Sequence, residues 1–172
     1  MGHLNVEIKA KCSDQEKVRV VLKSHNADFK GVDHQIDTYF IVPTGRLKLR
    51  EGNIENSLIF YEREDVKGPK QSRVILHRTE PDSSLKEILT KSLGILTVVD
   101  KQREIYFIDN VKFHLDTVQN LGTFMEIEAI DTTGDISKEK LLEQCTHYLA
   151  LFGTQESDLL NTSYSDQIAG IT

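Results

Sequence analysis

Polar and apolar residues alternate one by one near the start of the chain. Over residues 5–11 every second residue is polar or charged, and the residues between them are Val6, Ile8 and Ala10. A period of two predicts a β-strand with one charged face and one apolar face. For a single strand, the ordinary interpretation is that the charged face meets water.

The same alternation returns in four later segments. The positions that share a face are Arg46, Lys48 and Arg50, then Tyr61 and Arg63, then Lys101 and Arg103, and finally Glu126 and Glu128. Strands that share a charged face can close into a barrel, because the inside is then polar while helices cover the apolar outside. We therefore predict a barrel with a polar tunnel for a highly charged ligand.

Helical periodicity and turn residues divide the remaining chain. The predicted strands cover residues 5–11, 32–42, 46–50, 57–64, 72–79, 97–108, 111–118 and 123–130, and the predicted helices cover about 14–25, 85–93 and 137–152. Ser-x-x-Glu sequences that begin at Ser13 and Ser84 predict capping boxes for the first two helices. Residues 1–172 are expected to form one domain with a flexible end from about residue 165.

A short similarity connects the two halves of the chain. Residues 32–40 match residues 99–107 at five of nine positions, with an offset of 67 residues. Each copy follows a predicted helix and precedes a predicted hairpin, and the first hairpin is cationic whereas the second is acidic. If the similarity marks a repeat, the two hairpins face each other across the barrel and offer one wall to phosphates and the other to a divalent cation. Chance is the alternative, since short matches of this quality are not rare.

Composition narrows the class of ligand. The 172 residues carry a formal net charge of −6, which argues against a general binder of nucleic acid or of anionic membranes. Lysines and arginines nevertheless gather on the predicted strand faces, and this favours a small, compact polyanion. The sequence shows no apolar run near the roughly 20 residues of a membrane span and no secretory signal. Cys12 and Cys145 lack metal-ligand spacing, so we expect reduced thiols in a cytoplasmic protein.

Three carboxylates suggest a metal site. Glu126 and Glu128 lie two residues apart on one predicted strand, so both project to the same side, and Asp116 on the neighbouring strand could join them. Carboxylates this close repel each other unless a cation neutralises them, and Mg²⁺ or Mn²⁺ accepts a few carboxylates together with phosphate oxygens and water. Two alternatives stay open: the carboxylates meet water, or they pair with nearby cations. We expect a structural or supporting role for His114.

The cations outnumber what one carboxylate cluster would need. They are Lys9, Lys11, Arg46, Lys48, Arg50, Arg63, Arg73, Lys101 and Arg103. Arginine binds phosphate through two nitrogens and lysine binds it as a point charge, so a mixed set suits a triphosphate. The sequence has no Walker-type glycine-rich loop, no Ser-His-Asp arrangement and no zinc-ligand spacing.

Several short motifs follow one another along the chain. Each is weak alone, but their order and spacing together are specific for one protein family. They are Asn5-x-Glu7-x-Lys9, Asp37-Thr38-Tyr39-Phe40, Arg46-Leu47-Lys48-Leu49-Arg50, Tyr61-x-Arg63, Lys101-x-Arg103, His114-Leu115-Asp116 and Leu121-Gly122-x-Phe124-x-Glu126-Ile127-Glu128. Over almost the whole chain they resemble CYTH-domain proteins, the family that includes class IV adenylyl cyclases, thiamine triphosphatases and inorganic triphosphatases. The resemblance implies an α+β fold, an eight-stranded antiparallel β-barrel called the triphosphate tunnel, with helices packed on the outside. It also implies a triphosphate ligand bound with Mg²⁺ or Mn²⁺.

The resemblance also implies site residues, position by position. The implied metal ligands are Glu7, Asp116, Glu126 and Glu128. The implied triphosphate contacts are Lys9, Lys11, Lys48, Arg50, Arg63, Arg73, Lys101 and Arg103. We expect Lys9, Arg63 and Tyr61 to take part in catalysis, Tyr61 by orienting a neighbour through a hydrogen bond.

Asn5 departs from the family signature Glu-x-Glu-x-Lys, which has a glutamate at this position. An amide oxygen can still ligate a metal, but a site that relies on the carboxylate for a second metal is weakened. The expected protein is an enzyme that acts on ATP, thiamine triphosphate or tripolyphosphate, and its motifs look most like the adenylyl cyclase branch. Whether the nucleophile is the ribose 3′-hydroxyl or water stays open, and a non-catalytic nucleotide or polyphosphate sensor is the alternative. We expect no nucleic-acid or membrane partner, and a homodimer is compatible with the sequence.

Overall fold

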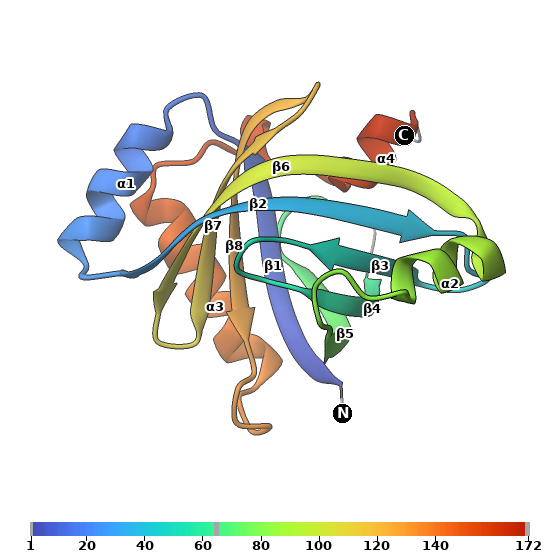
Figure 1. The fold of residues 1–172 in the computed structure, drawn as a ribbon. Coiled ribbons are helices and arrows are strands. Elements are labelled where there is room, and N and C mark those ends of the chain that lie inside the picture. The colour runs from blue at the N-terminus through green and yellow to red at the C-terminus, as the bar shows by residue number, and fades with distance from the viewer. Residues whose placement is uncertain (1, 64–65, 171–172) are drawn as a thin grey trace.

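Eight antiparallel strands close into a barrel in the computed structural model, which describes residues 2–63 and 66–170 (Figure 1). The strands are β1 His3–Lys11, β2 Asp28–Phe40, β3 Arg46–Glu51, β4 Ser57–Arg63, β5 Lys70–Arg78, β6 Ile95–Ile108, β7 Val111–Val118 and β8 Gly122–Ile130. Around the barrel they follow the order β1-β5-β4-β3-β2-β6-β7-β8. The predicted barrel is therefore confirmed, with strand ends that shift by a few residues. The predicted end of the fourth strand, Glu64, lies outside the described residues.

Helices cover the barrel unevenly (Figure 1). The helices are α1 Gln15–Ser24, α2 Leu85–Leu93, α3 Lys138–Leu151 and α4 Tyr164–Ala169, with a short 3₁₀ turn, η1 Glu156–Asp158. Both α1 and α3 lie on the side formed by β1, β7 and β8, whereas α2 lies at the far end of β2 and β6. No helix in the described ranges has the length and apolar character needed to cross a membrane.

The apolar face of β1 explains why its charged face points inward. Val6, Ile8 and Ala10 are buried outside the barrel wall, in a core shared with Leu22 of α1 and Leu141 of α3. Full burial of each large aliphatic side chain stabilises the fold by roughly 1.5–3 kcal/mol. Because neighbouring residues of a strand point to opposite faces, this packing turns the alternating polar residues toward the barrel interior.

The chain end differs from the expectation. The chain was expected to be flexible from about residue 165, whereas residues 164–169 form α4. The hydroxyl of Ser163 accepts the backbone N–H of Asp166 at 3.1 Å and so caps this helix, while Arg46 pairs with the Asp166 carboxylate at 3.3 Å. Tertiary contacts therefore hold a segment that has no helical periodicity of its own.

Neither predicted capping box forms as expected. The first helix is capped by Asp14, whose carboxylate accepts the backbone N–H of Lys17 at 3.2 Å, and Ser13 precedes the cap. The side chain of Ser84 makes no capping hydrogen bond. Local sequence placed both helices correctly but assigned their first hydrogen bonds to the wrong residues.

The similarity between residues 32–40 and 99–107 does not mark a structural repeat. The two segments lie in β2 and β6, which are hydrogen-bonded neighbours. Asp33 pairs with Arg103 in this register, so odd-numbered residues face inward on both strands and the odd offset turns matched residues to opposite faces. Asp33 is fully buried, whereas its match Asp100 lies outside and pairs with His34 at 2.7 Å. The two hairpins still face each other, because the strand order puts β3 and β4 opposite β8 and β7.

Candidate functional site

A cavity of about 790 Å³ lies inside the barrel and is lined by residues from every strand. The predicted site residues that line it are Glu7, Lys9, Lys48, Arg50, Tyr61, Arg63, Lys101, Arg103, Glu126 and Glu128. The carboxylates lie on β1 and β8, and most of the cations lie on β3, β4 and β6. The barrel therefore brings the two predicted groups of charge into one space.

Three predicted residues lie elsewhere. Lys11 is exposed at the end of β1, and Arg73 is exposed on the outer face of β5, where Ser72 and Val74 take the inward positions. Asp116 shares the face of β7 that carries His114, but it is fully buried and does not line the cavity. Arg73 was therefore assigned to the wrong face, because alternation shows which residues share a face without showing which face is inside.

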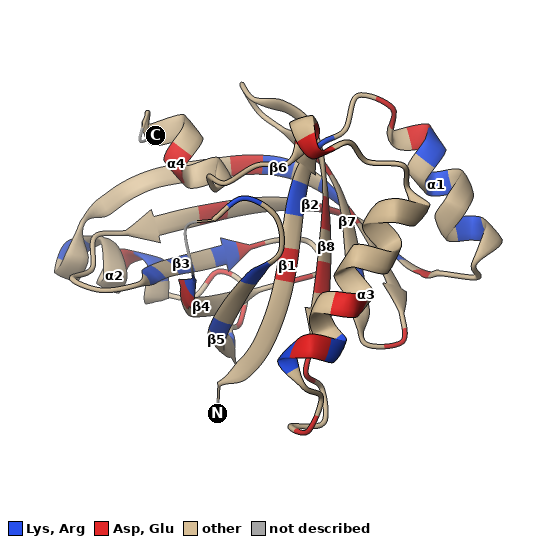
Figure 2. Ribbon diagram, turned by 180° about the vertical axis from the view of Figure 1, so that it is seen from behind, with Lys and Arg blue, Asp and Glu red and all other residues tan. Residues whose placement is uncertain are grey.

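The acidic wall is formed where β1 pairs with β8. Glu7 is the cross-strand partner of Glu128, and red segments lie side by side on the two strands in Figure 2. The amide of Asn5 donates a hydrogen bond to Oε1 of Glu128. On the other side, Nη1 of Arg63 donates to Oε1 of Glu7 at 3.2 Å. Asn5 thus supplies a donor to a neighbouring carboxylate, which a glutamate at this position could not do.

Glu126 lies between three nitrogen-bearing side chains. Lys9 Nζ is 3.5 Å and Arg103 Nη2 is 3.8 Å from its Oε2, and His114 Nδ1 is 3.4 Å from its Oε1. Burial alone would raise the pKa of Glu126, but Lys9, His114 and Arg103 outweigh it and hold this pKa well below its usual range. Glu126 is therefore ionised at neutral pH.

Glu128 has fewer neighbours that neutralise it. Burial raises the pKa of Glu128 to about 7; Lys112 opposes this shift, and Glu7 adds to it. A carboxylate with this pKa favours a proton or a cation beside it. The acidic wall is therefore short of positive charge at Glu128.

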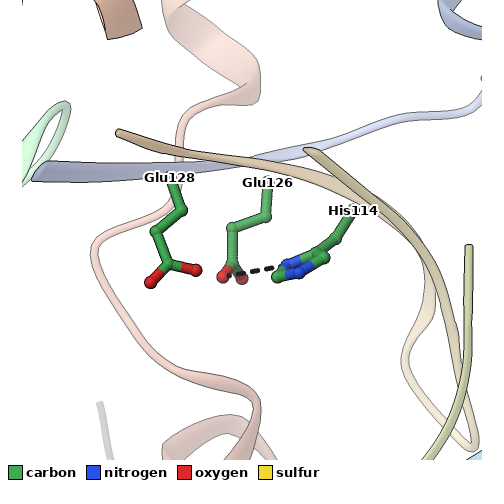
Figure 3. Close-up of side chains that lie close together, drawn as sticks. All are labelled: His114, Glu126 and Glu128. Atoms are coloured by element: carbon green, nitrogen blue, oxygen red, sulfur yellow. Dashed lines mark ion pairs between the residues drawn. The ribbon is translucent and has the colours of Figure 1, made fainter. Parts of the chain in front are cut away.

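Ligand atoms of His114, Glu126 and Glu128 lie within 4.8 Å of one another (Figure 3). The imidazole is 2 % exposed, and neither of its nitrogens makes a hydrogen bond to any residue that the structure describes. Burial, together with the charge of Arg103, lowers the pKa of His114 to about 4, so the ring is neutral at pH 7. Two carboxylates and a neutral imidazole whose nitrogens make no hydrogen bond form a donor set that fits a divalent cation.

Asp116, a predicted metal ligand, is engaged by other partners. Both of its oxygens accept hydrogen bonds from Arg103 at 2.7 Å, and Oδ2 also accepts the hydroxyl of Tyr164 at 2.8 Å. These bonds occupy both carboxylate oxygens, and Asp116 does not belong to the cluster of His114, Glu126 and Glu128. His114, expected to have only a structural or supporting role, takes its place in the cluster. The two-residue spacing of His114 and Asp116 was a signal that both share one strand face.

The cationic wall contains a buried carboxylate at its centre. Asp37 accepts two hydrogen bonds from Arg50 at 2.9 and 2.8 Å and one from Lys101 at 2.8 Å, and Lys48 Nζ lies 3.3 Å away. Burial opposes ionisation of Asp37, but these three cations hold its pKa well below its usual range. Asp37 is part of a recognised motif and was not predicted as a site residue. Asp37 pairs with Arg50, Lys101 and Lys48 in the absence of a ligand.

Two buried tyrosines lie beside the least paired cations. Lys48 Nζ donates to the hydroxyl of Tyr39 at 3.4 Å and lies 5.5 Å from the ring centroid of Tyr61. The guanidinium carbon of Arg63 is 5.7 Å from the same ring centroid. Burial raises the pKa of Tyr39 to about 12 and that of Tyr61 well above its usual range, so both hydroxyls stay neutral at pH 7. Aromatic ring faces attract cations, so Tyr61 positions both of these side chains.

Tyr164 closes one end of the cavity. Its ring centroid lies 4.9 Å from that of Phe124, and Lys9 Nζ lies 3.8 Å from the Tyr164 ring centroid. Together with the hydrogen bond to Asp116, these contacts fix α4 over the end of the barrel. Tyr164 was missed because the short polar segment around it shows no helical or strand period.

The loop between β3 and β4 reaches across the other end. Glu55 in this loop pairs with Arg50 Nη1 at 3.2 Å and with Lys112 of β7. The carboxylate of Asp33 accepts the backbone N–H groups of residues 54–55 at 2.9 and 3.0 Å and so holds the loop in place. Neither Glu55 nor Lys112 was predicted, because their contact joins strands far apart in the sequence.

Known proteins with the same architecture agree with this description. The family model of the CYTH domain matches residues 3–163. The protein named "Putative adenylate cyclase MJ0240" from Methanocaldococcus jannaschii is 28% identical over 178 residues, which cover 94% of this chain and 96% of that protein. A structure from Vibrio parahaemolyticus, named "putative adenylate cyclase", has a TM-score of 0.76 at 20% identity and covers 98% of this chain and 99% of that chain.

A third likeness is to HpAC1 from Hippeastrum, named "Putative adenylyl cyclase", whose structural description states a dominant triphosphatase activity. Its TM-score is 0.62 at 11% identity, and the match covers 99% of this chain and 97% of that chain. The two structural likenesses show a shared fold. With a family model that spans β1 to β8, the chain belongs to the CYTH domain family.

Proposed function

We propose that the protein is a divalent-metal-dependent enzyme that acts on a small triphosphate held inside the barrel. The observation that carries this proposal is the placement of a cationic wall opposite an acidic wall in a cavity of about 790 Å³. The names of the relatives support the same substrate class, since two carry the name adenylate cyclase and HpAC1 is described as a triphosphatase.

The side chains divide the work by how fully they are already paired. Arg103 and Lys101 point their nitrogens at Asp116 and Asp37 at 2.7–2.8 Å, so they chiefly shape the walls. Lys9, Lys48 and Arg63 make single contacts of 3.2–3.5 Å with carboxylates, and these three are best placed to turn toward phosphate oxygens. Arg50 adds the nitrogen that it now shares with Glu55.

The acidic wall would hold the metal. Glu7, Glu126 and Glu128 line the cavity on neighbouring strands, and their oxygens match the ligands that Mg²⁺ and Mn²⁺ prefer. A bound divalent cation would offset the negative charge that builds up on the phosphate chain during cleavage. Among the residues that the structure describes, nine cations and six carboxylates line the cavity, and a divalent cation beside the carboxylates of the acidic wall would offset their repulsion of a bound polyanion.

Product analysis tests this proposal directly. The full-length chain is incubated with ATP, thiamine triphosphate or tripolyphosphate, each with Mg²⁺ or Mn²⁺, and products are separated by anion-exchange chromatography. We expect metal-dependent turnover of at least one triphosphate; cyclic AMP with pyrophosphate identifies a cyclase, and orthophosphate identifies a hydrolase. Binding of a triphosphate without turnover would overturn the proposed enzymatic activity and favour a sensor. Asn5, which replaces the family glutamate, removes one carboxylate and makes this outcome relevant.

A further inference from the structure

We propose that His114 is a nitrogen ligand of the metal in this cavity and makes the site prefer Mn²⁺ over Mg²⁺. The inference rests on the proposed function, because it concerns the metal of the same site. It replaces Asp116, which the sequence suggested, by a neighbour on the same face of β7. It also changes the chemistry of the donor set from oxygen alone to oxygen with nitrogen.

Strand register brings the imidazole to the two carboxylates. His114 of β7 is the cross-strand partner of Glu126 of β8, and Glu128 follows two residues later on the same inward face. Figure 3 shows the imidazole beside the Glu126 carboxylate, with the Glu128 carboxylate on the far side of Glu126. The ligand atoms lie within 4.8 Å of one another, so small side-chain rotations would bring all three onto one ion.

The buried imidazole lies 3.4 Å from the Glu126 carboxylate but makes no hydrogen bond to it. It is 2 % exposed, and both nitrogens lack hydrogen bonds within the described part of the chain. A buried polar group without a partner is rare in folded proteins and is costly, so its presence needs an explanation. A metal ion bound by one ring nitrogen would give that nitrogen a partner.

The groups around His114 are engaged elsewhere. On its own strand, Lys112 pairs with Glu55 and Asp116 pairs with Arg103. On β6 its cross-strand partner is Ile105, which offers no hydrogen bond. Glu126 is thus the charged group that directly faces the ring, at 3.4 Å from Nδ1. Nδ1 of the imidazole therefore lies on the side of the ring that faces the carboxylate cluster.

A nitrogen ligand distinguishes Mn²⁺ from Mg²⁺, a choice that the sequence left open. Mg²⁺ strongly prefers oxygen ligands and retains water, whereas imidazole suits first-row transition metals, and Mn²⁺ accepts it together with carboxylates. A site of carboxylates alone would distinguish the two ions less. Removal of the imidazole should therefore weaken Mn²⁺ binding more than Mg²⁺ binding.

Direct Mn²⁺ binding tests the inference without an activity assay. Loss of the free Mn²⁺ electron paramagnetic resonance signal is measured in titrations of wild type, His114→Asn and a matched control, His34→Asn, which alters a half-exposed histidine on the outer face of β2. We expect about a tenfold or greater loss of Mn²⁺ affinity for His114→Asn, a smaller loss for Mg²⁺ measured by competition, and no change for His34→Asn.

A spectroscopic measurement keeps the test valid if His114→Asn does not fold. Pulsed electron paramagnetic resonance of Mn²⁺ bound to wild type should show coupling to a ¹⁴N nucleus, which changes to a ¹⁵N pattern when only histidines carry ¹⁵N. Bound Mn²⁺ without histidine coupling would overturn the ligand assignment while leaving metal-dependent turnover, and so the proposed function, intact. Absence of any Mn²⁺ binding, with or without tripolyphosphate, would overturn the ligand assignment, and absence of turnover with Mg²⁺ as well would overturn the proposed function.

Discussion

Lys48 and Arg50 share one face of β3 but differ in their bonds to Asp37. Arg50 makes two hydrogen bonds to this carboxylate, whereas Lys48 lies 3.3 Å away and also contacts Tyr39. Lys48→Met should therefore weaken tripolyphosphate binding by about 1.5–3 kcal/mol while leaving stability nearly unchanged. Arg50→Met should lower both binding and the free energy of unfolding, because Asp37 then loses its bidentate partner.

Calorimetric titration and urea unfolding of both variants separate the two roles. Equal effects of both substitutions on stability would contradict the distinction, as would unaltered tripolyphosphate affinity in Lys48→Met.

Asn5 tests how the acidic wall tolerates charge. Its amide donates to Glu128, and Asn5→Glu would replace this donor with a carboxylate beside Glu128 and Glu7. Without metal, the variant should lose roughly 1–3 kcal/mol of stability through like-charge repulsion and a lost donor. With Mn²⁺ the loss should shrink, and turnover at low metal should rise.

Thermal unfolding with and without Mn²⁺ measures the first effect, and initial rates at limiting Mn²⁺ measure the second. A variant that is equally destabilised in both conditions and slower than wild type would show that Asn5 belongs to a site complete as it stands.

Lys101 links ligand binding to protons. Burial lowers its pKa to about 7 although Asp37 opposes the shift, so at pH 8 the free protein holds this amine mostly neutral. A bound polyanion favours the charged form and raises this pKa, so binding at pH 8 should take up part of a proton. Titration calorimetry in buffers of different ionisation enthalpy should show less uptake in Lys101→Met than in wild type. Identical uptake in both proteins would assign the proton to another group.

At the scale of single residues, the sequence identified most of the charges in the cavity but not their partners. Alternation grouped Glu7, Lys9 and Glu126 on charged strand faces, and the closed barrel turns these faces inward. It could not show that Arg103 would bond to Asp116, because that pair depends on the register of β6 against β7. Arg73 was assigned inward because alternation shows which residues share a face without showing which face is inside.

At the scale of elements, α4 is the part that sequence patterns miss, and its attachment can be measured. The Tyr164 ring contacts Phe124 and Lys9, and its hydroxyl bonds to Asp116. Tyr164→Ala should lower the free energy of unfolding by about 3–5 kcal/mol, and Tyr164→Phe by about 1 kcal/mol. Arg46→Ala removes only a half-exposed ion pair with Asp166 and should cost less than about 1 kcal/mol.

Chemical unfolding of the three variants ranks these contacts. A loss in Arg46→Ala as large as that in Tyr164→Ala would mean that the ion pair, rather than the aromatic ring, fastens α4 to the barrel.

The long elements were predictable because each carries a complete periodic pattern. Strand β1 alternates over its whole length, β7 and β8 alternate over residues 111–116 and 125–129, and α3 has a wide apolar stripe. The caps of α1 and α2 were not predictable, because several serines and aspartates near each helix start compete for the same backbone N–H groups. The contacts that hold α4 come from strands distant in the sequence, so no local pattern predicts this helix.

At the scale of the whole molecule, the two walls of the barrel couple the metal to the phosphate chain. Tripolyphosphate alone would add negative charge beside Glu7, Glu126 and Glu128, and a divalent cation alone would add positive charge beside Lys9, Arg63 and Arg103. Each ligand offsets the charge that the other introduces, so each should bind more tightly when the other is present.

Thermal unfolding with Mn²⁺, with tripolyphosphate and with both measures this coupling. The rise in Tm with both ligands should exceed the sum of the separate rises, by an amount that corresponds to about 1–3 kcal/mol. Because Mn²⁺ and tripolyphosphate also associate in solution, Glu126→Gln serves as the control: it removes one carboxylate of the acidic wall, so most of the excess should disappear. An excess of the same size in Glu126→Gln would place the coupling in solution rather than in the barrel, and additive shifts in wild type would mean that the opposing walls bind their ligands independently.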